Sequence, residues 1–401
     1  MFEQKIGIIT PWFGRFAGGV ELQARTMARE LNRRGVETIV LTTCSRSPFD
    51  SWWHDADEPG IYDVEAVKTY RFPTNKIREP YDSAIKKLTR GKELSVQEQR
   101  EFFHFGLNSD ALVDAVQNYL NDNYQLIALP YFYGLTHSVV NKYRQQISLV
   151  PCFHNEPQFY WRATEELLAN AKQIFFNSPE EKELTIRHYG PRVGRLVVEG
   201  VVTGEGVELR QSEEEPQEKP REAPDSYFIY AGRKERGKNV HLLCEWFGDY
   251  TRRFKRDTKL VFIGGGDKSL LPAGDRYVDF DFVSETKKLQ LISASKGIIN
   301  LSENESFSLV IMEGWLCGVP CVVSADCAVT RNHVRRSNGG LFVSNSDEFC
   351  LALKYLEDHE STRRELAANG REYVTREFSF DVVLAKYLEA LGAGCAESLY
   401  V

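Results

Sequence analysis

Two glutamates, Glu305 and Glu313, stand on either side of the expected start of a helix. The apolar segment from Gly297 to Leu301 predicts a buried strand. The apolar spacing from Phe307 to Leu316 predicts a helix that stops at Gly318-Val319-Pro320. This order places Glu305 at a helix N-terminus, where free backbone N–H groups attract anions, and Glu313 about two turns further along. Carboxylates at these two positions can accept hydrogen bonds from the hydroxyls of a ligand whose phosphates lie between them.

Two basic residues, Arg233 and Lys238, follow another apolar segment, Tyr227 to Ala231, and a glycine turn. Cations and helix N-termini can stabilise a phosphate group that gains negative charge when a bond to it breaks. A charged loop that faces water explains Arg233 and Lys238 equally well when they are considered alone. Lys234 and Arg236, which stand between them, are expected to face solvent.

The glutamate pair, in its strand–turn–helix setting, resembles the signature of the retaining GT-B glycosyltransferases of family 4, the glycosyl transferases group 1. The resemblance implies that Glu305 contacts the donor sugar and that Glu313 holds the nucleotide ribose. The R-x4-K spacing earlier in the chain is similar to the diphosphate clamp of this family, which assigns Arg233 and Lys238 to the phosphates.

The resemblance also assigns the donor phosphates to backbone N–H groups at the helix start. The residues concerned are Ser306, Phe307, Ser308 and Leu309. Family members usually carry glycine where Ser308 stands, and serine, which is small, departs only slightly from that pattern.

A glycine-rich segment, Phe13 to Glu21, joins the first expected strand to the first expected helix. Gly18 and Gly19 permit a backbone approach that a side chain would block, and the helix behind them adds its dipole. The segment is similar to the family's glycine-rich loop between donor phosphate and acceptor, and a tight turn is the structural alternative. It is not a dinucleotide fingerprint, because G-x-G-x-x-G is absent.

Further candidates lie at the ends of strands. His154 matches a position at which many family members carry a histidine near the donor sugar, and a hydrogen-bonded loop histidine is the alternative. Glu156 is a weaker candidate for acceptor contact. Asn177 and Ser178 resemble the family's short Asn-Ser turn, which an N-cap of the next helix explains equally well.

For the nucleotide base, the resemblance implies strand-end backbone in the second domain. Gly265, in a run of three glycines, fits a loop under the nucleotide, and Val283 fits the base edge. Asp279 and Asp281 imitate the D-x-D metal site of the other major glycosyltransferase fold. Because they precede the base-contact position, we expect no metal there, and no cofactor besides the nucleotide-sugar substrate.

Apolar strands and helical segments alternate in two series, a pattern that predicts parallel sheets. In the first series a helix is expected from Gly18 to Arg34. The expected strands of that series are Lys5 to Thr10, Glu37 to Thr43, Val67 to Phe72, Leu126 to Pro130, Ser148 to Phe153 and Gln173 to Asn177. Those of the second series are Tyr227 to Ala231, Lys259 to Gly264, Tyr277 to Phe282, Gly297 to Leu301 and Cys321 to Ser324.

The predicted fold is α/β of the GT-B type, with two Rossmann-like, doubly wound parallel-sheet domains that face an interdomain cleft. Residues 1–203 form the acceptor-side domain and residues 227–379 the nucleotide-sugar domain. Residues 204–226 are polar and contain several prolines, so they are predicted to form a linker or an exposed loop. The helical segment within residues 380–401 resembles the GT-B closing helix that returns to the first domain.

Residues 75–110 form a charged helical insertion whose basic residues are nearly balanced by acidic ones. A solvated face is the first interpretation. An acceptor lid, or a patch that touches anionic membrane, is the second.

Composition excludes several classes of protein. The 401 residues are 42% hydrophobic and 27% charged, which fits a globular chain long enough for two cores. A net charge of −7 argues against a general nucleic-acid binder. The eight cysteines include no C-x2-C pair, so buried free thiols are expected. Without a signal peptide or a long apolar run, a cytoplasmic location is expected, with peripheral contact at the inner face of the membrane as a further possibility.

The resemblance to family 4 therefore implies a retaining glycosyltransferase that moves a sugar from a UDP- or GDP-sugar to a glycan or lipid-linked glycan, in surface polysaccharide biosynthesis. Glu305, His154, Arg233 and Lys238 are the expected catalytic residues. Two alternatives stay open: a GT-B nucleotide-sugar epimerase and a non-catalytic GT-B scaffold.

Overall fold

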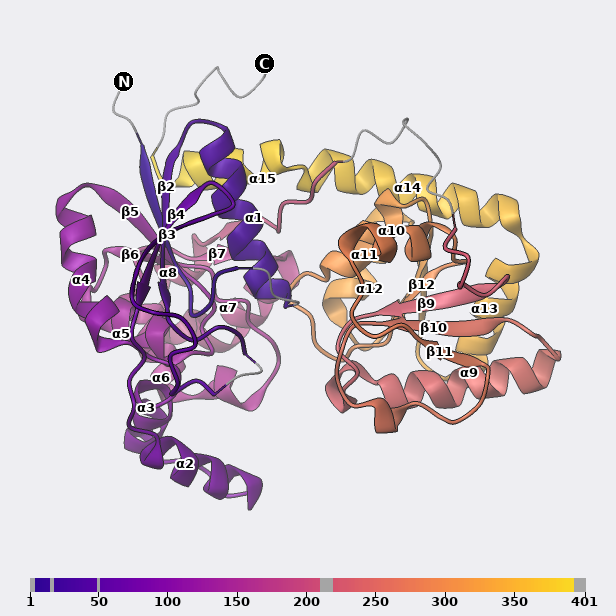
Figure 1. Ribbon diagram of the computed structural model, residues 1–401, viewed down its shortest axis with the longest axis horizontal. Helices are drawn as coiled ribbons and strands as arrows, with labels where there is room; N and C mark the ends of the chain where they lie inside the picture. Colours follow the sequence, from indigo (N-terminus) through magenta and orange to yellow (C-terminus); the bar gives the residue numbers. More distant parts are fainter. Residues whose placement is uncertain (1–3, 15–17, 49–50, 210–218, 393–401) are drawn as a thin grey trace. The chain divides into compact units, whose positions relative to one another are not determined.

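A computed structural model of the chain describes residues 4–14, 18–48, 51–209 and 219–392. Contacts between Cα atoms divide the chain into two compact units (Figure 1). The first unit comprises residues 1–206 and 383–401, and the second comprises residues 207–382.

The first unit is built on a six-stranded sheet in the order β3-β4-β2-β1-β5-β6, parallel except for the antiparallel edge strand β3. The order reverses between β1 and β5, which are neighbours in the sheet. The strands are β1 (Lys5–Ile9), β2 (Glu37–Thr43), β3 (Gly60–Val64), β4 (Val67–Phe72), β5 (Tyr124–Ala128) and β6 (Ile147–Leu149). The short strands β7 (Phe175–Phe176) and β8 (Val201–Val202) pair separately.

Helices and one 3₁₀ turn connect the strands of this unit, because parallel neighbours require crossover connections. They are α1 (Gly19–Arg33), α2 (Glu79–Thr89), α3 (Val96–His104), α4 (Asp110–Asn121), α5 (Gly134–Lys142), η1 (Pro157–Tyr160), α6 (Arg162–Asn170), α7 (Pro179–Val193) and α8 (Arg195–Val198). Helix α15 (Phe380–Ala390) also contributes, since the ring of Tyr387 lies 4.5 Å from that of Phe175 and the carbonyl of Leu391 accepts a 2.9 Å hydrogen bond from Gln125.

The second unit contains an all-parallel sheet in the order β11-β10-β9-β12-β13-β14, which reverses between β9 and β12. Its strands are β9 (Tyr227–Ala231), β10 (Lys259–Ile263), β11 (Tyr277–Asp279), β12 (Ile298–Asn300), β13 (Cys321–Ser324) and β14 (Gly340–Val343). Its helices and turns are η2 (Arg236–Lys238), α9 (Val240–Phe254), η3 (Lys268–Leu270), α10 (Glu285–Ser293), α11 (Leu309–Leu316), α12 (Ala328–Ser337), α13 (Ser346–Asp358) and α14 (Glu360–Phe378). Helices α9 and α13 pack together, as do α11 and α14, so both faces of the sheet are covered (Figure 1).

The predicted α/β fold class is confirmed, because each unit has the strand order of a doubly wound sheet. Strands β2, β4, β9 and β13 have their predicted bounds. The segments predicted from Ser148 to Phe153 and from Gln173 to Asn177 form the shorter strands β6 and β7. Strands β3 and β14 were not predicted, and the placement of both sheets about one cleft stays a prediction.

The expected linker is described only in part, since residues 210–218, which include Glu213 and Pro216, lie outside the described residues. Val207 pairs with Ser379 in an isolated parallel bridge, and its N–H donates to the carbonyl of Phe378 at 2.8 Å. The start of the linker is therefore tied to the end of α14.

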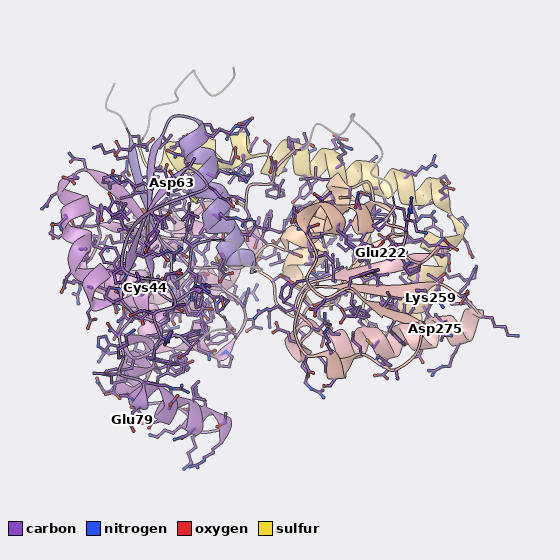
Figure 2. The ribbon with its side chains drawn as sticks, in the orientation of Figure 1. Cys44, Asp63, Glu79, Glu222, Lys259 and Asp275 are labelled. Atoms are coloured by element: carbon purple, nitrogen blue, oxygen red, sulfur yellow. The ribbon has the colours of Figure 1, made fainter. Side chains whose placement is uncertain are left out.

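The seven cysteines among the described residues are free, and all except the half-buried Cys317 are buried. Cys44, at the end of β2, is an example (Figure 2). Cys395 lies outside the described residues. No helix among the described residues is long and apolar enough to cross a membrane.

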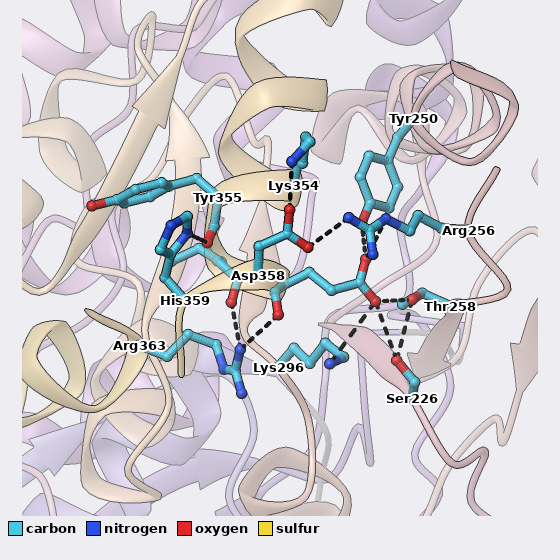
Figure 3. Close-up of polar contacts among 12 residues, drawn as sticks. Ser226, Tyr250, Arg256, Thr258, Lys296, Lys354, Tyr355, Asp358, His359 and Arg363 are labelled. Carbon is cyan, nitrogen blue, oxygen red and sulfur yellow. Dashed lines mark hydrogen bonds and ion pairs between the residues drawn. The ribbon is translucent and has the colours of Figure 1, made fainter. Parts of the chain in front are cut away.

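Glu357, in the last turn of α13, is the shared partner of side chains that precede β9, β10 and β12 and of others in and after α9; Figure 3 labels these partners. Its carboxylate accepts hydrogen bonds from, or forms ion pairs with, side chains of several surrounding segments: Ser226, Tyr250, Arg256, Thr258 and Lys296. Only 10% of the Glu357 side chain is exposed, so these partners replace water.

Glu357→Ala is expected to lower the free energy of unfolding of the second unit by about 3 kcal/mol, because it leaves the buried hydroxyls of Tyr250 and Thr258 and two half-buried cations without their shared acceptor. Urea unfolding monitored by circular dichroism measures the change. Glu372→Ala is the matched control, since that side chain is 78% exposed. Equal stability of the two variants would show that the network contributes nothing.

Candidate functional site

Lys238 and Glu305 come together at the point where the strand order of the second sheet reverses. Lys238 ends the turn η2 after β9, and Glu305 lies in the loop after the neighbouring strand β12. Lys238 Nζ lies 2.9 Å from Glu305 Oε1. In doubly wound sheets, ligands bind at the carboxyl ends of strands at such a reversal.

Asn300, the last residue of β12, holds Glu305 in place. Its Nδ2 donates to Glu305 Oε1 at 3.2 Å and to the hydroxyl of Ser308 at 3.0 Å. Its Oδ1 accepts from the backbone N–H of Ser302 at 2.9 Å. Sequence reasoning did not assign Asn300 a role, although an amide at the end of an otherwise apolar strand was the available signal.

The Glu305 side chain is 14% exposed, so its charge depends on its neighbours. Burial opposes ionisation, but the Lys238 ammonium, together with hydrogen bonds from Lys238, Ser302 and Asn300, outweighs burial and lowers the pKa of Glu305. The site therefore presents an ionised carboxylate already paired with a cation.

The helix that follows Glu305 begins at Leu309, two residues later than predicted. Glu313 consequently lies one turn inside α11. Phe307 is fully buried, with its ring 5.3 Å from that of His333 and 4.8 Å from that of Phe378. Phe307 thus anchors the loop through its side chain and can offer a ligand only its backbone.

Ser308 occupies the N-cap of α11 with φ 79° and ψ 71°, in the left-handed region, and its side chain forms no capping hydrogen bond. Glycine adopts this conformation readily, and a side chain there costs about 1–2 kcal/mol. Ser308 is 7% exposed and Ser306 9%, so the helix start is enclosed. Ser308, which stands where the family usually has glycine, therefore has a strained backbone conformation. The hydrogen bond from Asn300 to its hydroxyl stabilises the residue there.

Ser308→Gly is expected to be about 1 kcal/mol more stable than Ser308→Ala, because both lose the hydroxyl but only alanine keeps a side chain in the left-handed region. Chemical denaturation of the two variants measures the difference. At Ser346, the first residue of α13, the same pair should show the opposite order, since glycine weakens a helix. The same order at both positions would contradict the strain at Ser308.

Glu313 is paired with a lysine that sequence reasoning missed. Lys288 Nζ, from α10, lies 2.8 Å from Glu313 Oε1 and 3.0 Å from Glu285 Oε2. Burial opposes the charge of Lys288, but the two carboxylates outweigh it and raise its pKa. The carboxylate predicted to hold a ribose is therefore held between two helices.

Arg233 and Lys238 lie on one loop but differ in environment. The Arg233 side chain is 49% exposed and lies 3.3 Å from Glu235. Arg236 is exposed, as predicted. The prediction for Lys234 is wrong, because its side chain is 0% exposed and its Nζ lies 3.0 Å from Asp279 Oδ1. Spacing alone did not show that this loop folds back over the sheet and encloses Lys234.

The loop is held by the glycine run after β10. The N–H of Lys234 donates to the carbonyl of Gly265 at 2.8 Å. Gly264 and Gly266 have φ of 104° and 118°, and a Cβ on Gly264 would lie 2.4 Å from the carbonyl oxygen of Gly232. Only glycine fits this close approach of two backbones.

Asp279 and Asp281 are both neutralised by lysines. Lys268 Nζ lies 2.7 Å from Asp281 Oδ2, while Lys234 pairs with Asp279 as described. In the described part of the chain, no group of three or more His, Cys, Asp or Glu residues is arranged to hold a metal ion. Val283, predicted at the base edge, is half-buried just before the N-cap of α10.

In the first unit, Gly18 is the N-cap of α1 and Gly19 its first residue. A Cβ on Gly18 would collide with the carboxylate of Glu21, whereas one on Gly19 would meet nothing within 4 Å. Residues 15–17 of the predicted loop lie outside the described residues. A larger residue at Gly18 would therefore require the Glu21 side chain to move.

His154 is partly exposed in the loop after β6. Its Nδ1 lies 3.8 Å from Glu156 Oε1, and the same oxygen accepts a 2.6 Å hydrogen bond from the hydroxyl of Tyr131. The geometry places His154 beside an acidic side chain that is itself anchored to the buried Tyr131.

Ser178 caps α7, as the alternative interpretation of the Asn-Ser turn predicted, since its hydroxyl accepts from the N–H of Glu181 at 3.2 Å. The Glu181 carboxylate accepts from the N–H groups of Phe153 and Asn177, each at 2.6 Å. Glu181 is 2% exposed, and burial raises its pKa to about 8, against these hydrogen bonds. Asn177 Oδ1 also accepts a 2.8 Å hydrogen bond from Gln23.

The second unit of the chain is similar in sequence to a family of known proteins. Residues 211–373, which include Arg233, Lys238, Glu305 and Glu313, match the family described as glycosyl transferases group 1. The chain is 22% identical to the D-inositol 3-phosphate glycosyltransferase of Paenarthrobacter aurescens (strain TC1), over 94% of each chain. These matches support a glycosyltransferase. The enzyme of the same name from Xylanimonas cellulosilytica is 24% identical, over 93% of this chain and 91% of its own.

Solved glycosyltransferase-like structures share the fold. Trehalose-6-phosphate synthase OtsA aligns with a TM-score of 0.74 at 9% identity, covering 98% of this chain and 99% of its own. Sucrose-phosphate synthase from Thermosynechococcus elongatus aligns with a TM-score of 0.68 at 18% identity, covering 98% and 100%. HepE of Anabaena, solved in complex with UDP and glucose, gives a TM-score of 0.65 at 15% identity, covering 97% and 99%. The chain thus has the two Rossmann-like α/β units of GT-B proteins.

Proposed function

We propose that the protein is a retaining glycosyltransferase of the family 4 kind, which moves a sugar from a UDP- or GDP-sugar to a glycan or lipid-linked glycan in surface polysaccharide biosynthesis. The observation that carries the proposal is the Lys238–Glu305 pair at the reversal of the second sheet. An ammonium group beside a buried carboxylate offers a phosphate and a sugar hydroxyl complementary partners within one site.

The proposed division of labour follows the charges. Lys238, with Arg233 from the same loop, stabilises the diphosphate as the bond between it and the sugar breaks. The backbone N–H groups at the start of α11 face the same negative charge. Glu305 accepts hydrogen bonds from the sugar hydroxyls and so fixes the sugar. These groups supply the positive charge without a metal ion.

In the proposed reaction, an acceptor hydroxyl attacks the anomeric carbon on the face from which the diphosphate leaves. The new bond joins the acceptor oxygen to that carbon, the bond to the diphosphate oxygen breaks, and the departing phosphate takes the acceptor proton. His154 is proposed to lie near the donor sugar. The reaction is proposed to occur in the cytoplasm, at the inner face of the membrane when the acceptor is lipid-linked.

Glu313 is proposed to hold the ribose, with Lys288 as the residue that positions it. The 2.8 Å pair leaves the carboxylate fixed before any nucleotide binds, which reduces the ordering that binding requires. Lys288→Ala should therefore weaken donor binding more than it slows the chemical step.

Donor binding tests the proposal directly. Thermal unfolding of the full chain with UDP-, GDP- and ADP-sugars should show a rise of about 5–10 °C for one nucleotide at a hundred times its Kd. Glu305→Gln should retain nucleotide binding and lose the preference for the sugar. Failure of every donor to raise the midpoint would refute the proposal, and formation of an epimer from UDP-GlcNAc without acceptor would favour an epimerase.

A further inference from the structure

The reversal point of the first sheet is lined by aromatic side chains. Trp12 follows β1 and Tyr133 follows β5, the two strands between which the order reverses. Their ring centroids are 4.6 Å apart with the ring planes at 82°. Where the second sheet presents charged groups at its reversal, the first presents rings.

Three more rings extend this group. Trp52, in the loop after β2, lies 5.4 Å from Tyr133 and 6.1 Å from Trp12. Trp53 lies 5.8 Å from Trp52, and Tyr81 of α2 lies 5.8 Å from Trp52 and 5.3 Å from Trp53. We call Trp12, Trp52, Trp53, Tyr81 and Tyr133 the aromatic cluster. All except Trp12, which is 1% exposed, keep part of their surface open to solvent.

The indole N–H groups of the cluster are used within the protein. Trp12 Nε1 donates to the hydroxyl of Ser45 at 3.0 Å, and Trp53 Nε1 donates to the carbonyl of Phe105 at 3.0 Å. Trp52 Nε1 donates to the carbonyl of Pro48 at 3.3 Å. These bonds fix the rings and occupy their polar edges, so a ligand can meet only the ring surfaces that neighbouring side chains leave open.

Polar groups stand directly beside the rings. Asp55, two residues after Trp53, accepts hydrogen bonds from the N–H and hydroxyl of Thr74 at 2.8 and 2.9 Å and pairs with Lys76 at 2.5 Å. The Arg78 guanidinium lies 4.6 Å above the Trp53 ring. Apolar ring surfaces beside fixed hydrogen-bonding groups match a pyranose, whose faces carry C–H groups and whose edge carries hydroxyls.

The charged insertion builds one wall of this cluster. Helix α2 contributes Tyr81, whose ring lies 4.8 Å from that of Phe102 in α3, and Phe102 lies 5.1 Å from Trp161. In Figure 2, Glu79 marks the start of α2 at the lower end of the first unit. The insertion is therefore packed onto the unit through its rings, and is more than a solvated face.

We propose that the aromatic cluster is a saccharide-binding site, which stacks a pyranose ring of a glycan acceptor against Trp52, Trp53 and Tyr81. This inference rests on the proposed function, for which it names the residues that contact the acceptor. A membrane surface fits the cluster less well, because nearby basic side chains are already paired with carboxylates: Lys76 with Asp55, Arg78 with Asp82 and Lys87 with Glu98.

The test measures binding of the full chain, without donor, to a printed array of bacterial and eukaryotic glycans. The wild type should bind at least one glycan, and Trp53→Ala should reduce that binding about tenfold or more. Trp53→Phe, which keeps an aromatic face, should recover part of it. Tyr355→Ala is the matched control, because this tyrosine is 45% exposed on α13 of the second unit.

Absence of any bound glycan, or equal binding by the wild type and a folded Trp53→Ala variant, would overturn the proposal. The proposal would also be overturned if Trp53→Ala no longer sedimented with phosphatidylglycerol vesicles but still bound the glycan as the wild type does. That result would assign the aromatic cluster to a membrane surface. The chain could also bind a glycan through Trp53 and yet bind no nucleotide sugar. That result would support the saccharide-binding site and contradict the proposed sugar transfer. Donor binding unaffected by Trp53→Ala shows that the variant is folded.

Discussion

Lys238→Ala is expected to lower the rate of sugar transfer by about 10²–10³-fold, the usual loss when one preorganised group that stabilises developing negative charge is removed. Its Nζ lies 2.9 Å from Glu305, so the substitution also leaves a carboxylate that is only 14% exposed without its cation. Repulsion between that carboxylate and the donor phosphates adds to the loss. Steady-state kinetics at saturating donor measures it.

Matched variants separate this effect from general disturbance of the loop. Arg236→Ala removes an exposed cation from the same turn and should leave transfer unchanged. Lys238→Arg keeps the charge but changes its shape, so it should recover part of the activity. An active Lys238→Ala variant with a verified acceptor would remove Lys238 and its pair with Glu305 from the mechanism.

The stability of the first unit is expected to fall as pH rises from about 4.5 to about 8, through Glu181. Burial raises the pKa of this carboxyl from 4.5 to about 8. Between these values the folded chain keeps the proton that the unfolded chain releases, so unfolding releases a proton and a higher pH favours it. The full effect above pH 8 is on the order of 5 kcal/mol.

Glu181→Gln, which is neutral at every pH, should remove this slope. Urea unfolding of the two proteins between pH 5 and 8.5 gives the difference. Burial lowers the pKa of His137 to about 3. Below its unfolded pKa, His137 therefore makes stability rise with pH, but this contribution is the same in both proteins and cancels in their difference. Glu183→Gln, on the same helix with a side chain that is 69% exposed, is the control. Parallel curves for wild type and Glu181→Gln would place the Glu181 pKa near its ordinary value.

The two sheets differ in what stands at their reversal points, and this difference accords with the two proposed substrates. The second sheet has Lys238 and Glu305 there, groups that suit a phosphorylated sugar. The first has Trp12 and Tyr133, groups that suit an uncharged ring. A sugar transferase binds two substrates, a phosphorylated donor and an acceptor.

The sequence by itself determined the fold class and most of the strands, although not β3 and β14, because apolar runs between helical segments leave few alternatives to parallel sheets. It also indicated Lys238 and Glu305 separately as candidate site residues, since each follows a strand at a spacing that a known family shares, but it did not predict that the two side chains pair. Local pattern was sufficient there because each residue is placed by the strand directly before it.

Only the tertiary structure decided which side chains pair with one another across different segments of the chain. Lys234 reads as a surface residue, yet the glycine run after β10 folds against its loop and buries it beside Asp279. Lys288 lies far from Glu313 in sequence and reaches it because α10 and α11 pack side by side. The aromatic cluster likewise draws its rings from loops after three different strands and from α2. Such contacts depend on which strands become neighbours, and that order is set by packing of the whole sheet rather than by any local segment.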